Sequence, residues 1–267
     1  MMPELVLLVV DVGNTQTHLG TFRGEELAEH WRFATVRTST ADELGAALRN
    51  LLELRGMAFG DVSASIVSST VPELAPEWVM MAARYLGHEM PAVGPGLKTG
   101  MPIRMDNPRE VGADRLVNAI AAFEQVAGAC IVVDFGTAIT YDVVSGAGEY
   151  LGGIITPGVE ISMEALTARA AKLRKIDLAA PRTLIGKSTE DAMRAGLVYG
   201  FAAQVDGIVT RMREEMGADT TAIATGGLAG HIVPYCDTLD IVDDLLTLKG
   251  LRIIWLRQAE PEAPPSA

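Results

Sequence analysis

Short apolar runs separated by turns make up the first part of the chain, and they predict a small sheet followed by helices. The first three expected strands lie at residues 5–10, 17–22 and 27–34, and Arg23-Gly24-Glu25-Glu26 between the last two is typical of a hairpin turn. Thr40 and Glu43 have the spacing of a capping box, so we expect a helix to begin there. The remaining elements expected in this part are a strand at 64–68, a helix at 71–86, a loop at 94–102 and a helix at 116–126.

The second half repeats this order of elements. Its expected strands lie at 130–133, 140–144 and 150–155, with a turn at 146–148 between the last two. The helices that we expect after them are at 156–175, 188–199 and 201–216. A strand at 222–224 then leads through Thr225-Gly226-Gly227 into a short helix.

The same motif follows the first strand of each half. One apolar run ends in Asp11-Val12-Gly13-Asn14-Thr15 and the other in Asp134-Phe135-Gly136-Thr137-Ala138, about half the chain further on. A single aspartate in this context often only caps a turn, but two in matched contexts indicate a site. Glycine allows a tight turn, and the amide and hydroxyl groups behind it can bind an anion. Two such turns facing each other would hold a nucleoside triphosphate and its metal ion, which suggests phosphoryl transfer.

This duplicated order of strands and turns resembles the ribonuclease-H-like fold of the actin-like ATPase and sugar-kinase superfamily. The resemblance implies an α/β protein with two mixed-sheet domains that flank an ATP cleft. We expect the first domain over residues 1–116 and the second over 117–257, followed by a disordered tail at 258–267.

Composition excludes several other classes of protein. Of the 267 residues 49% are hydrophobic and 21% charged, which is enough apolar material for a core. The formal net charge of −12 argues against nucleic acid as the main partner. Cys130 and Cys236 have no metal-ligand spacing, so we expect buried free thiols in a reducing cytosol. The apolar run at 5–10 is far shorter than the ~20 residues that cross a bilayer, so we expect a cytoplasmic protein without a membrane partner.

Gly112-Ala113-Asp114-Arg115 is the next candidate for chemistry. Asp114 beside Arg115 at a helix start could be a dipole partner in a surface ion pair. Alternatively, a carboxylate near the γ-phosphate accepts the proton of an attacking hydroxyl, while the arginine binds an anionic acceptor.

With this element included, the chain resembles type III pantothenate kinases from residue 5 to about 256. The pieces that carry the resemblance are Asp11-Val-Gly-Asn-Thr15, His30-Trp-Arg32, Thr38 to Glu43, Asn107-Pro108, Glu110-Val-Gly-Ala-Asp-Arg115, Asp134-Phe-Gly-Thr-Ala138, Gly152-Gly-Ile-Ile-Thr-Pro-Gly158, Gly186-Lys-Ser-Thr189, Thr225-Gly-Gly227 and Leu248-Lys-Gly-Leu251. Sugar kinases of the superfamily do not share the Gly-Ala-Asp-Arg element.

The resemblance implies a role for each matching residue. ATP phosphates would be bound by the first loop, which consists of Asp11, Val12, Gly13, Asn14, Thr15, Gln16, Thr17 and His18, and Thr137 would touch ATP. Asp11 would hold Mg²⁺ through water, and Asp134 would bind K⁺ or NH₄⁺ as a monovalent activator. Asp114 would be the general base, and Gly112, Ala113, Asp114 and Arg115 would contact pantothenate. Thr189 would reach pantothenate from the partner subunit of a homodimer, whose apolar contact we expect from Leu166, Leu173, Met193, Leu197 and Phe201.

One position departs from the family pattern. The family commonly has a tyrosine three residues before the proline of Asn107-Pro108, in the pantothenate site, and this chain has Met105. Methionine keeps apolar contact but loses a hydroxyl donor. The departure leaves open a kinase acting on another small hydroxy acid. A catalytically silent regulatory paralogue is the other alternative, but such a protein should lose Asp114 or the glycine turns, and this chain retains them.

Two further patterns predict nothing. Gly186-Lys187-Ser188 resembles the end of a P-loop, but the required earlier glycine is replaced by Pro181 and no strand precedes it. The four histidines, His18, His30, His88 and His231, are scattered without metal-ligand spacing.

Overall fold

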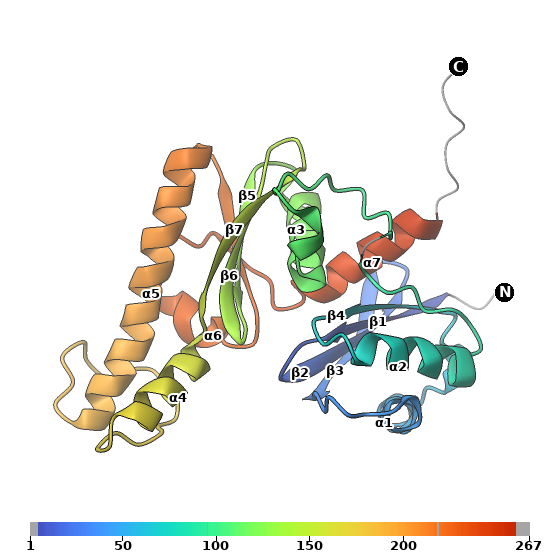
Figure 1. Cartoon of the computed structure of the whole chain (residues 1–267), viewed down its shortest axis with the longest axis horizontal. Helices are drawn as coiled ribbons and strands as arrows, with labels where there is room; N and C mark the ends of the chain where they lie inside the picture. The colour runs from blue at the N-terminus through green and yellow to red at the C-terminus, as the bar shows by residue number, and fades with distance from the viewer. Residues whose placement is uncertain (1–4, 95, 218, 260–267) are drawn as a thin grey trace. The chain divides into compact units, whose positions relative to one another are not determined.

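The computed structural model describes residues 5–94, 96–217 and 219–259, and they form two compact units (Figure 1). The first unit comprises the residues up to 100, residues 107–121 and those from 247 onward; the second comprises 101–106 and 122–246. Each unit contains one mixed β-sheet with its own hydrophobic core. The expected α/β class is therefore confirmed.

The sheet of the first unit has the strand order β3-β2-β1-β4. Its strands are β1 (Val6–Val12), β2 (Gln16–Arg23), β3 (Glu26–Ala34) and β4 (Ala64–Ser69). β2 runs antiparallel to both β1 and β3, whereas β4 runs parallel to β1. β1 is buried along almost its whole length, because it lies in the middle of the sheet. The first three strands lie where the sequence predicts them, within one or two residues.

Two helical segments pack against the core side of this sheet. α1 (Ala41–Glu53) begins at the predicted capping box: Thr40 N–H donates to Glu43 Oε2 at 2.8 Å, and Glu43 N–H donates to Thr40 Oγ1 at 3.4 Å. Of the helix expected at 71–86, only α2 (Leu74–Met81) is α-helical. The chain then continues as one wider π-helical turn, Ala82–Leu86. Trp78 and Met81 of α2 are fully buried in this core.

The last helix, α7 (Leu246–Ala259), has no counterpart among the elements expected from the sequence. Its buried residues Leu248, Leu251 and Ile254 recur at intervals of three, a helical signal that the sequence contains. A Cβ on Gly250 would overlap the carbonyl oxygen of Val117 in α3 (Ala113–Val126). Glycine therefore lets the two helices of this unit approach closely at that point.

The sheet of the second unit repeats the first and adds one strand, in the order β7-β6-β5-β8-β9. Its strands are β5 (Cys130–Phe135), β6 (Ala138–Val144), β7 (Tyr150–Pro157), β8 (Thr221–Thr225) and β9 (Ile241–Val242). β6 is antiparallel to β5 and β7, and β8 is parallel to β5, as in the first unit. This agreement in order and direction shows the internal duplication directly. β9 is short and was not expected.

The helices of the second unit differ from the expected ones in two respects. α4 (Val159–Arg169) ends well before residue 175, so the basic residues after Arg169 lie in an irregular segment rather than on a helix. The two helices expected at 188–199 and 201–216 are one continuous helix, α5 (Thr189–Met216). Gly200 does not interrupt α5, because Val198, Phe201 and Val205 around it are buried on one face against the core. The remaining helical elements are α6 (Ala229–Ile232) and the single turns Phe59–Asp61, Pro108–Glu110 and Val233–Tyr235.

The bounds of the two compact units differ from those of the expected domains, both near residue 117 and at the C-terminal helix. Residues 117–121 and α7 group with the first unit, although we expected them in the second. The tail expected at 258–267 begins inside α7, and residues 260–267 lie outside the described residues. Over the part of the chain that is described, no helix is both long and apolar enough to cross a membrane.

Candidate active site

The first glycine turn joins β1 to β2 in the first unit. Gly13 N–H donates to the carbonyl oxygen of Gln16 at 3.0 Å, and a Cβ on Gly13 would lie 2.9 Å from that oxygen. The side chain of Asn14 accepts from Arg37 Nη2 at 2.8 Å and donates to Thr70 Oγ1 at 3.4 Å. Asn14, Thr15 and Gln16 are exposed. The turn thus presents polar groups to solvent on a fixed backbone, as an anion-binding loop requires.

Asp11 lies at the end of β1 and is half-buried. The strand register puts it directly between His18 on β2 and Ser68 on β4. Of the eight residues of this loop that we expected to bind ATP, three have buried side chains, namely Val12, Thr17 and His18. These three can therefore influence a ligand only through the backbone or through their neighbours.

His18 is neutral at physiological pH. Burial, reinforced by the positive charge of Arg32 and by His30, lowers the pKa of His18 to about 3. The ring of His30 lies edge-on to it, with 5.7 Å between the ring centroids.

Asp114 occupies the first turn of α3, also in the first unit. Its carboxylate folds back over the helix start, where it accepts hydrogen bonds from its own amide and from that of Arg115. A Cβ on Gly112 would lie 2.5 Å from Asp114 Oδ1, so glycine is needed for the carboxylate to take this position. Burial nevertheless raises the pKa of Asp114, since the charged form loses its hydration. A carboxylate with a raised pKa beside Arg115 is suited to accept a proton.

The turn before Asp114 is fixed by its own side chains. Asn107 Nδ2 donates to Glu110 Oε1 at 2.7 Å, and Asn107 Oδ1 accepts from the amide of Arg109 at 3.3 Å. Pro108 begins the single helical turn Pro108–Glu110. The Asn107-Pro108 element of the sequence therefore sets the direction in which the chain enters α3.

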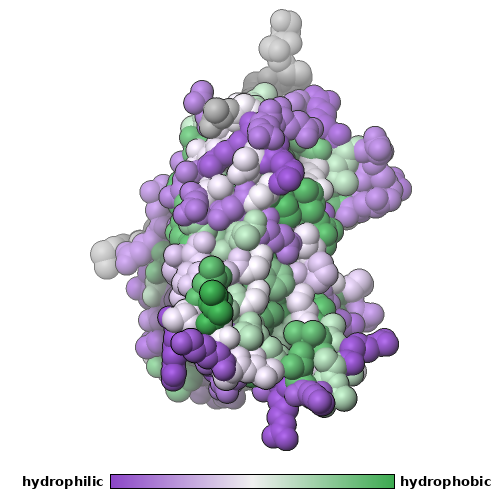
Figure 2. Space-filling view, turned by 90° about the vertical axis from the view of Figure 1, so that its left-hand side faces the viewer, coloured by the Kyte–Doolittle hydropathy of each residue, from purple (hydrophilic) through white to green (hydrophobic). Residues whose placement is uncertain are grey.

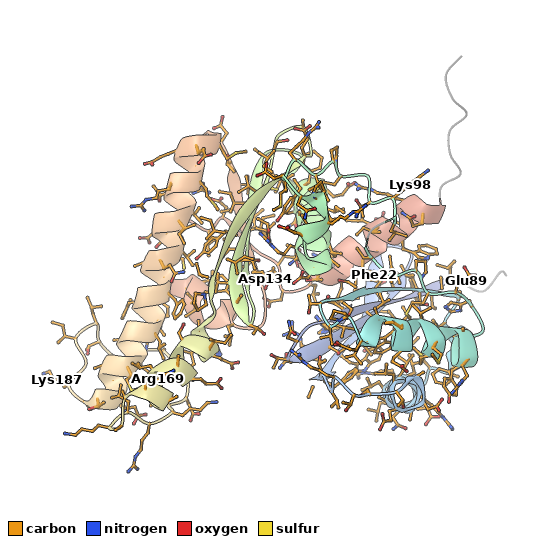
Figure 3. All side chains as sticks on the ribbon, viewed as in Figure 1. Phe22, Glu89, Lys98, Asp134, Arg169 and Lys187 are labelled. Carbon is orange, nitrogen blue, oxygen red and sulfur yellow. The ribbon has the colours of Figure 1, made fainter. Side chains whose placement is uncertain are left out.

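Asp134 lies near the carboxyl end of β5, in the second unit (Figure 3), and a Cβ on Gly136 would lie 3.7 Å from Asp134 Oδ1. Gly226 has φ +98°, and a Cβ there would overlap Asp134 Oδ1. A Cβ on Gly158 would overlap the carbonyl oxygen of Thr137, which accepts from Gly158 N–H at 3.2 Å. The side chain of Thr137 is exposed. Glycine is therefore required at position 226 beside the carboxylate of Asp134, and at position 158 beside the carbonyl oxygens of Gly136 and Thr137.

Thr189 is the first residue of α5. Ser188 caps this helix, because its Oγ accepts from the amide of Asp191 at 3.1 Å. A Cβ on Gly186 would overlap the backbone of Asp191 and Ala192, so the segment packs tightly on the first helical turn. Gly186-Lys187-Ser188 is therefore a helix cap and not a phosphate loop. Thr189 lines a hollow of about 390 Å³ together with Lys172, Arg174, Lys175, Ile176, Asp177, Glu190 and Met193.

Met105 lies in the short segment 101–106, which belongs to the second unit. Arg104 N–H donates to the carbonyl oxygen of Tyr150 at 2.8 Å, and Tyr150 N–H donates to that of Pro102 at 2.8 Å. These bonds attach the segment to the start of β7. Met105 is half-buried, and its Cγ lies 3.9 Å from the Cβ position of Gly152.

The two units thus carry different sets of the expected site residues. The first contains Asp11 to His18 and Gly112 to Arg115, and the second contains Met105, Asp134, Thr137 and Thr189. Sequence reasoning missed Ser68 and Thr70, although Thr70 Oγ1 donates to the carbonyl oxygen of Val12 at 3.1 Å. The sequence signal that could have revealed them is the run of hydroxyl residues Ser68-Ser69-Thr70 at the end of an apolar strand. In a parallel sheet, such residues lie beside the carboxyl end of the neighbouring strand, which here is β1.

The donor set of Asp11 fits Mg²⁺. Within the described residues, no three histidine, cysteine, aspartate or glutamate side chains cluster as a protein cage for a metal would require. Mg²⁺ does not need such a cage, because it keeps several waters and is held by one or two carboxylates together with substrate phosphates. One half-buried carboxylate beside an exposed polar turn meets this requirement.

Comparison with known proteins identifies close relatives. A family model described as type III pantothenate kinase matches residues 7–211. The type III pantothenate kinase of Moorella thermoacetica is 52% identical over 252 residues, which cover 94% of this chain and 99% of that protein. That of Streptomyces avermitilis is 53% identical over 261 residues, covering 94% of this chain and 98% of that protein.

Solved structures show the fold at much lower identity. The ethanolamine utilization protein EutJ from Carboxydothermus hydrogenoformans has a TM-score of 0.59 at 14% identity, covering 95% of this chain and 91% of that one. A ROK family transcriptional regulator, a homologue of the E. coli MLC protein, has a TM-score of 0.52 at 12% identity, covering 94% of this chain and 78% of that one. These likenesses confirm the expected actin-like and sugar-kinase type of fold, and at such identities they show nothing more.

Proposed function

The chain belongs to the type III pantothenate kinase family, and from this we propose that it transfers the γ-phosphate of ATP to the primary hydroxyl of pantothenate. The product is 4′-phosphopantothenate, and the reaction is the first step of coenzyme A biosynthesis. The observation that carries this assignment is 52% identity to a curated relative over 94% of the chain.

Asp114 is the general base of the proposed reaction. Its raised pKa supports this role, because a base whose pKa lies nearer the working pH accepts a proton more effectively in the transition state. It would take the proton of the attacking hydroxyl while Arg115 binds the carboxylate of pantothenate. Gly112 and Ala113 would contact the substrate through the backbone that leads into α3.

Asp11 and the turn behind it hold the phosphates of ATP. The exposed groups of Asn14, Thr15 and Gln16 suit this role, and the buried Val12, Thr17 and His18 keep the turn in place. Asp11 would hold Mg²⁺ through water. When bound, Mg²⁺ neutralises charge on the phosphates, so that positioning and electrostatics account for most of the rate of transfer.

Asp134 holds the monovalent activator, K⁺ or NH₄⁺. Its carboxylate and the carbonyl oxygens of Gly136 and Thr137, which follow it in the same turn, support this, because hard cations prefer oxygen ligands. The side chain of Thr137 is exposed, as a contact with ATP requires. Met105 would give pantothenate apolar contact at a position where the family commonly has tyrosine.

A homodimer completes the pantothenate site in our proposal, with Thr189 supplied by the partner subunit. The apolar residues of the second unit support a protein contact there: Ile154, Ile155, Ile161, Leu166, Leu184 and Ile185 are all exposed. Figure 2 looks onto the side that bears α5 and shows green apolar groups among pale and purple residues. Leu197 and Phe201, which we expected in this contact, instead lie in the core of the unit.

We also propose a cytoplasmic location, where ATP is available. Cys130 is buried and Cys236 half-buried; neither forms a disulfide, and burial raises the pKa of each thiol to about 12. Such thiols are unreactive, which suits a reducing compartment but does not require it.

A coupled kinase assay tests the acceptor and the activator together. We expect ADP release with pantothenate in potassium or ammonium buffer, low activity in sodium buffer, and loss of this cation response in Asp134→Ala. Turnover of other small hydroxy acids at a similar kcat/KM would reassign the acceptor and implicate Met105. Equal activity in all three salts would remove the cation role of Asp134.

A further inference from the structure

Three polar side chains form a row across the first sheet. Asp11 on β1 is paired directly with His18 on β2 and with Ser68 on β4. Residues that lie directly opposite each other on neighbouring strands project to the same face, with Cβ atoms about 4.5–5.5 Å apart in an antiparallel pair. His18 and Ser68 therefore stand on either side of the carboxylate that we assign to the divalent ion.

Each of the two flanking side chains has one buried polar atom without a hydrogen-bond partner. His18 is only 9% exposed and Ser68 is fully buried, yet His18 Nε2 and Ser68 Oγ have no partner among the described residues. Buried polar atoms in folded proteins are almost always hydrogen-bonded, and ordered water serves where no protein group does. Both atoms belong to the face that carries Asp11, so water beside Asp11 would satisfy them.

The side chains of this row can bind water beside Asp11. His18 faces Arg32 across the strand pair and lies edge-on to His30. An imidazole nitrogen and the hydroxyl of Ser68 can each form a hydrogen bond with a water molecule.

We propose that His18 and Ser68 hold the water molecules through which Asp11 binds the divalent ion of the ATP complex. Both would act as positioning residues, because their buried side chains would reach the ion only through its water. The role explains why His18, at the end of the expected ATP-binding segment, has a buried side chain. The inference rests on the proposed function only in assigning the ion to the ATP phosphates.

The test measures metal affinity rather than turnover. Mn²⁺ serves as the probe, titrated into the full-length protein with a non-hydrolysable ATP analogue and followed by electron paramagnetic resonance. We expect Ser68→Ala and His18→Leu each to weaken Mn²⁺ binding by about 10–100-fold, the usual effect of losing an outer-shell partner. His18→Gln, which keeps a polar group near the position of Nε2, should recover part of the affinity.

Thr21→Val is the matched control. Thr21 lies on the same strand as His18, is also fully buried, and its Oγ1 also lacks a partner among the described residues. It is paired with Leu8 of the core, on the opposite face. Its replacement should leave Mn²⁺ affinity unchanged.

Unchanged Mn²⁺ affinity in a folded Ser68→Ala protein would overturn the inference, and so would an equal loss in Thr21→Val. Ser68→Ala decides the matter if His18→Leu does not fold, because it only removes an oxygen. The outcome is separate from the proposed function: a wild-type protein that binds Mn²⁺ in this way but leaves pantothenate unphosphorylated would refute that function and keep this inference.

Discussion

Asp114 experiences two opposing influences at the start of α3. The amides of Asp114 and Arg115 donate to its carboxylate and favour the charged form, whereas burial disfavours it and prevails, so the pKa is raised. A general base benefits from this balance, because the carboxylate is held in place yet holds a proton more readily than an exposed aspartate. If Asp114 is the base that we propose, its burial serves catalysis at a cost in stability.

The stability of Asp114→Asn should consequently depend on pH relative to the wild type. A carboxyl group with a raised pKa in the folded state binds protons more tightly there than in the unfolded chain. Its contribution to the free energy of unfolding is fully present below the ordinary pKa of aspartate and is lost as pH rises through the raised value. Asparagine does not titrate, so we expect the variant to gain stability relative to wild type as pH rises through this window.

Urea denaturation of both proteins across that pH range measures the difference. A difference that stays constant with pH, or one that favours the wild type increasingly as pH rises, would contradict the raised pKa. Asp61→Asn provides a comparison, because Asp61 also accepts a backbone hydrogen bond, from the amide of Ala58, but is exposed.

The sequence pointed to candidate site residues more readily than to how each of them is held. Asp11, Asp134 and Asp114 stand out because each follows a recognisable motif. The clash that forces glycine at position 158 joins residues distant in the chain, Gly158 and Thr137, and no local pattern reveals it. The burial of His18 and Ser68 likewise depends on strand register, which the single sequence does not determine.

At the scale of elements, the sequence predicted helix starts and turns correctly where interactions between neighbouring residues determine them. The capping box at Thr40 set the start of α1, and the hairpin turn at Gly24 set the pairing of β2 with β3. Predictions failed where tertiary contacts decide. α5 passes through Gly200 because its buried face continues on both sides, although glycine lowers helix propensity by about 1 kcal/mol.

The missing helix α7 has a similar explanation. Its sequence contains apolar residues at helical spacing but also Gly250, and glycine in that position reads as a break. The structure shows that Gly250 serves close packing against Val117 of α3. Packing between helices far apart in the sequence therefore outweighed the local signal.

At the scale of the whole molecule, the exposed apolar residues of the second unit need an explanation, because burial within the chain does not account for them. Ile155 of β7 is 62% exposed, and Ile185, which lies between β7 and Thr189, is 79% exposed. Large apolar groups gathered on one surface commonly mark a protein contact. A two-fold contact here would bring the same residues of both copies together, including the start of α5.

Mixing two inactive variants tests whether this contact completes the active site. Asp114→Asn removes the base and Thr189→Arg blocks the hydroxyl contributed to the partner. We expect a mixture of the two, after subunit exchange, to regain one working site per heterodimer. Thr189→Ser keeps the hydroxyl and should remain active by itself.

Two controls are needed: light scattering measures the oligomeric state, and a separate measurement shows that the subunits exchange. An active monomer, or no recovery of activity between chains shown to exchange, would contradict the shared site.

The most direct test of the central claim is the transfer of phosphate in a single turnover, comparing wild type with Asp114→Asn. Mass spectrometry of the reaction with ATP, Mg²⁺, K⁺ and pantothenate should detect 4′-phosphopantothenate with the wild type. The variant should bind pantothenate with similar affinity but transfer phosphate about 10²–10⁴-fold more slowly, which is the usual contribution of a positioned base. Near-native transfer by the variant, or no product from the wild type, would contradict the account.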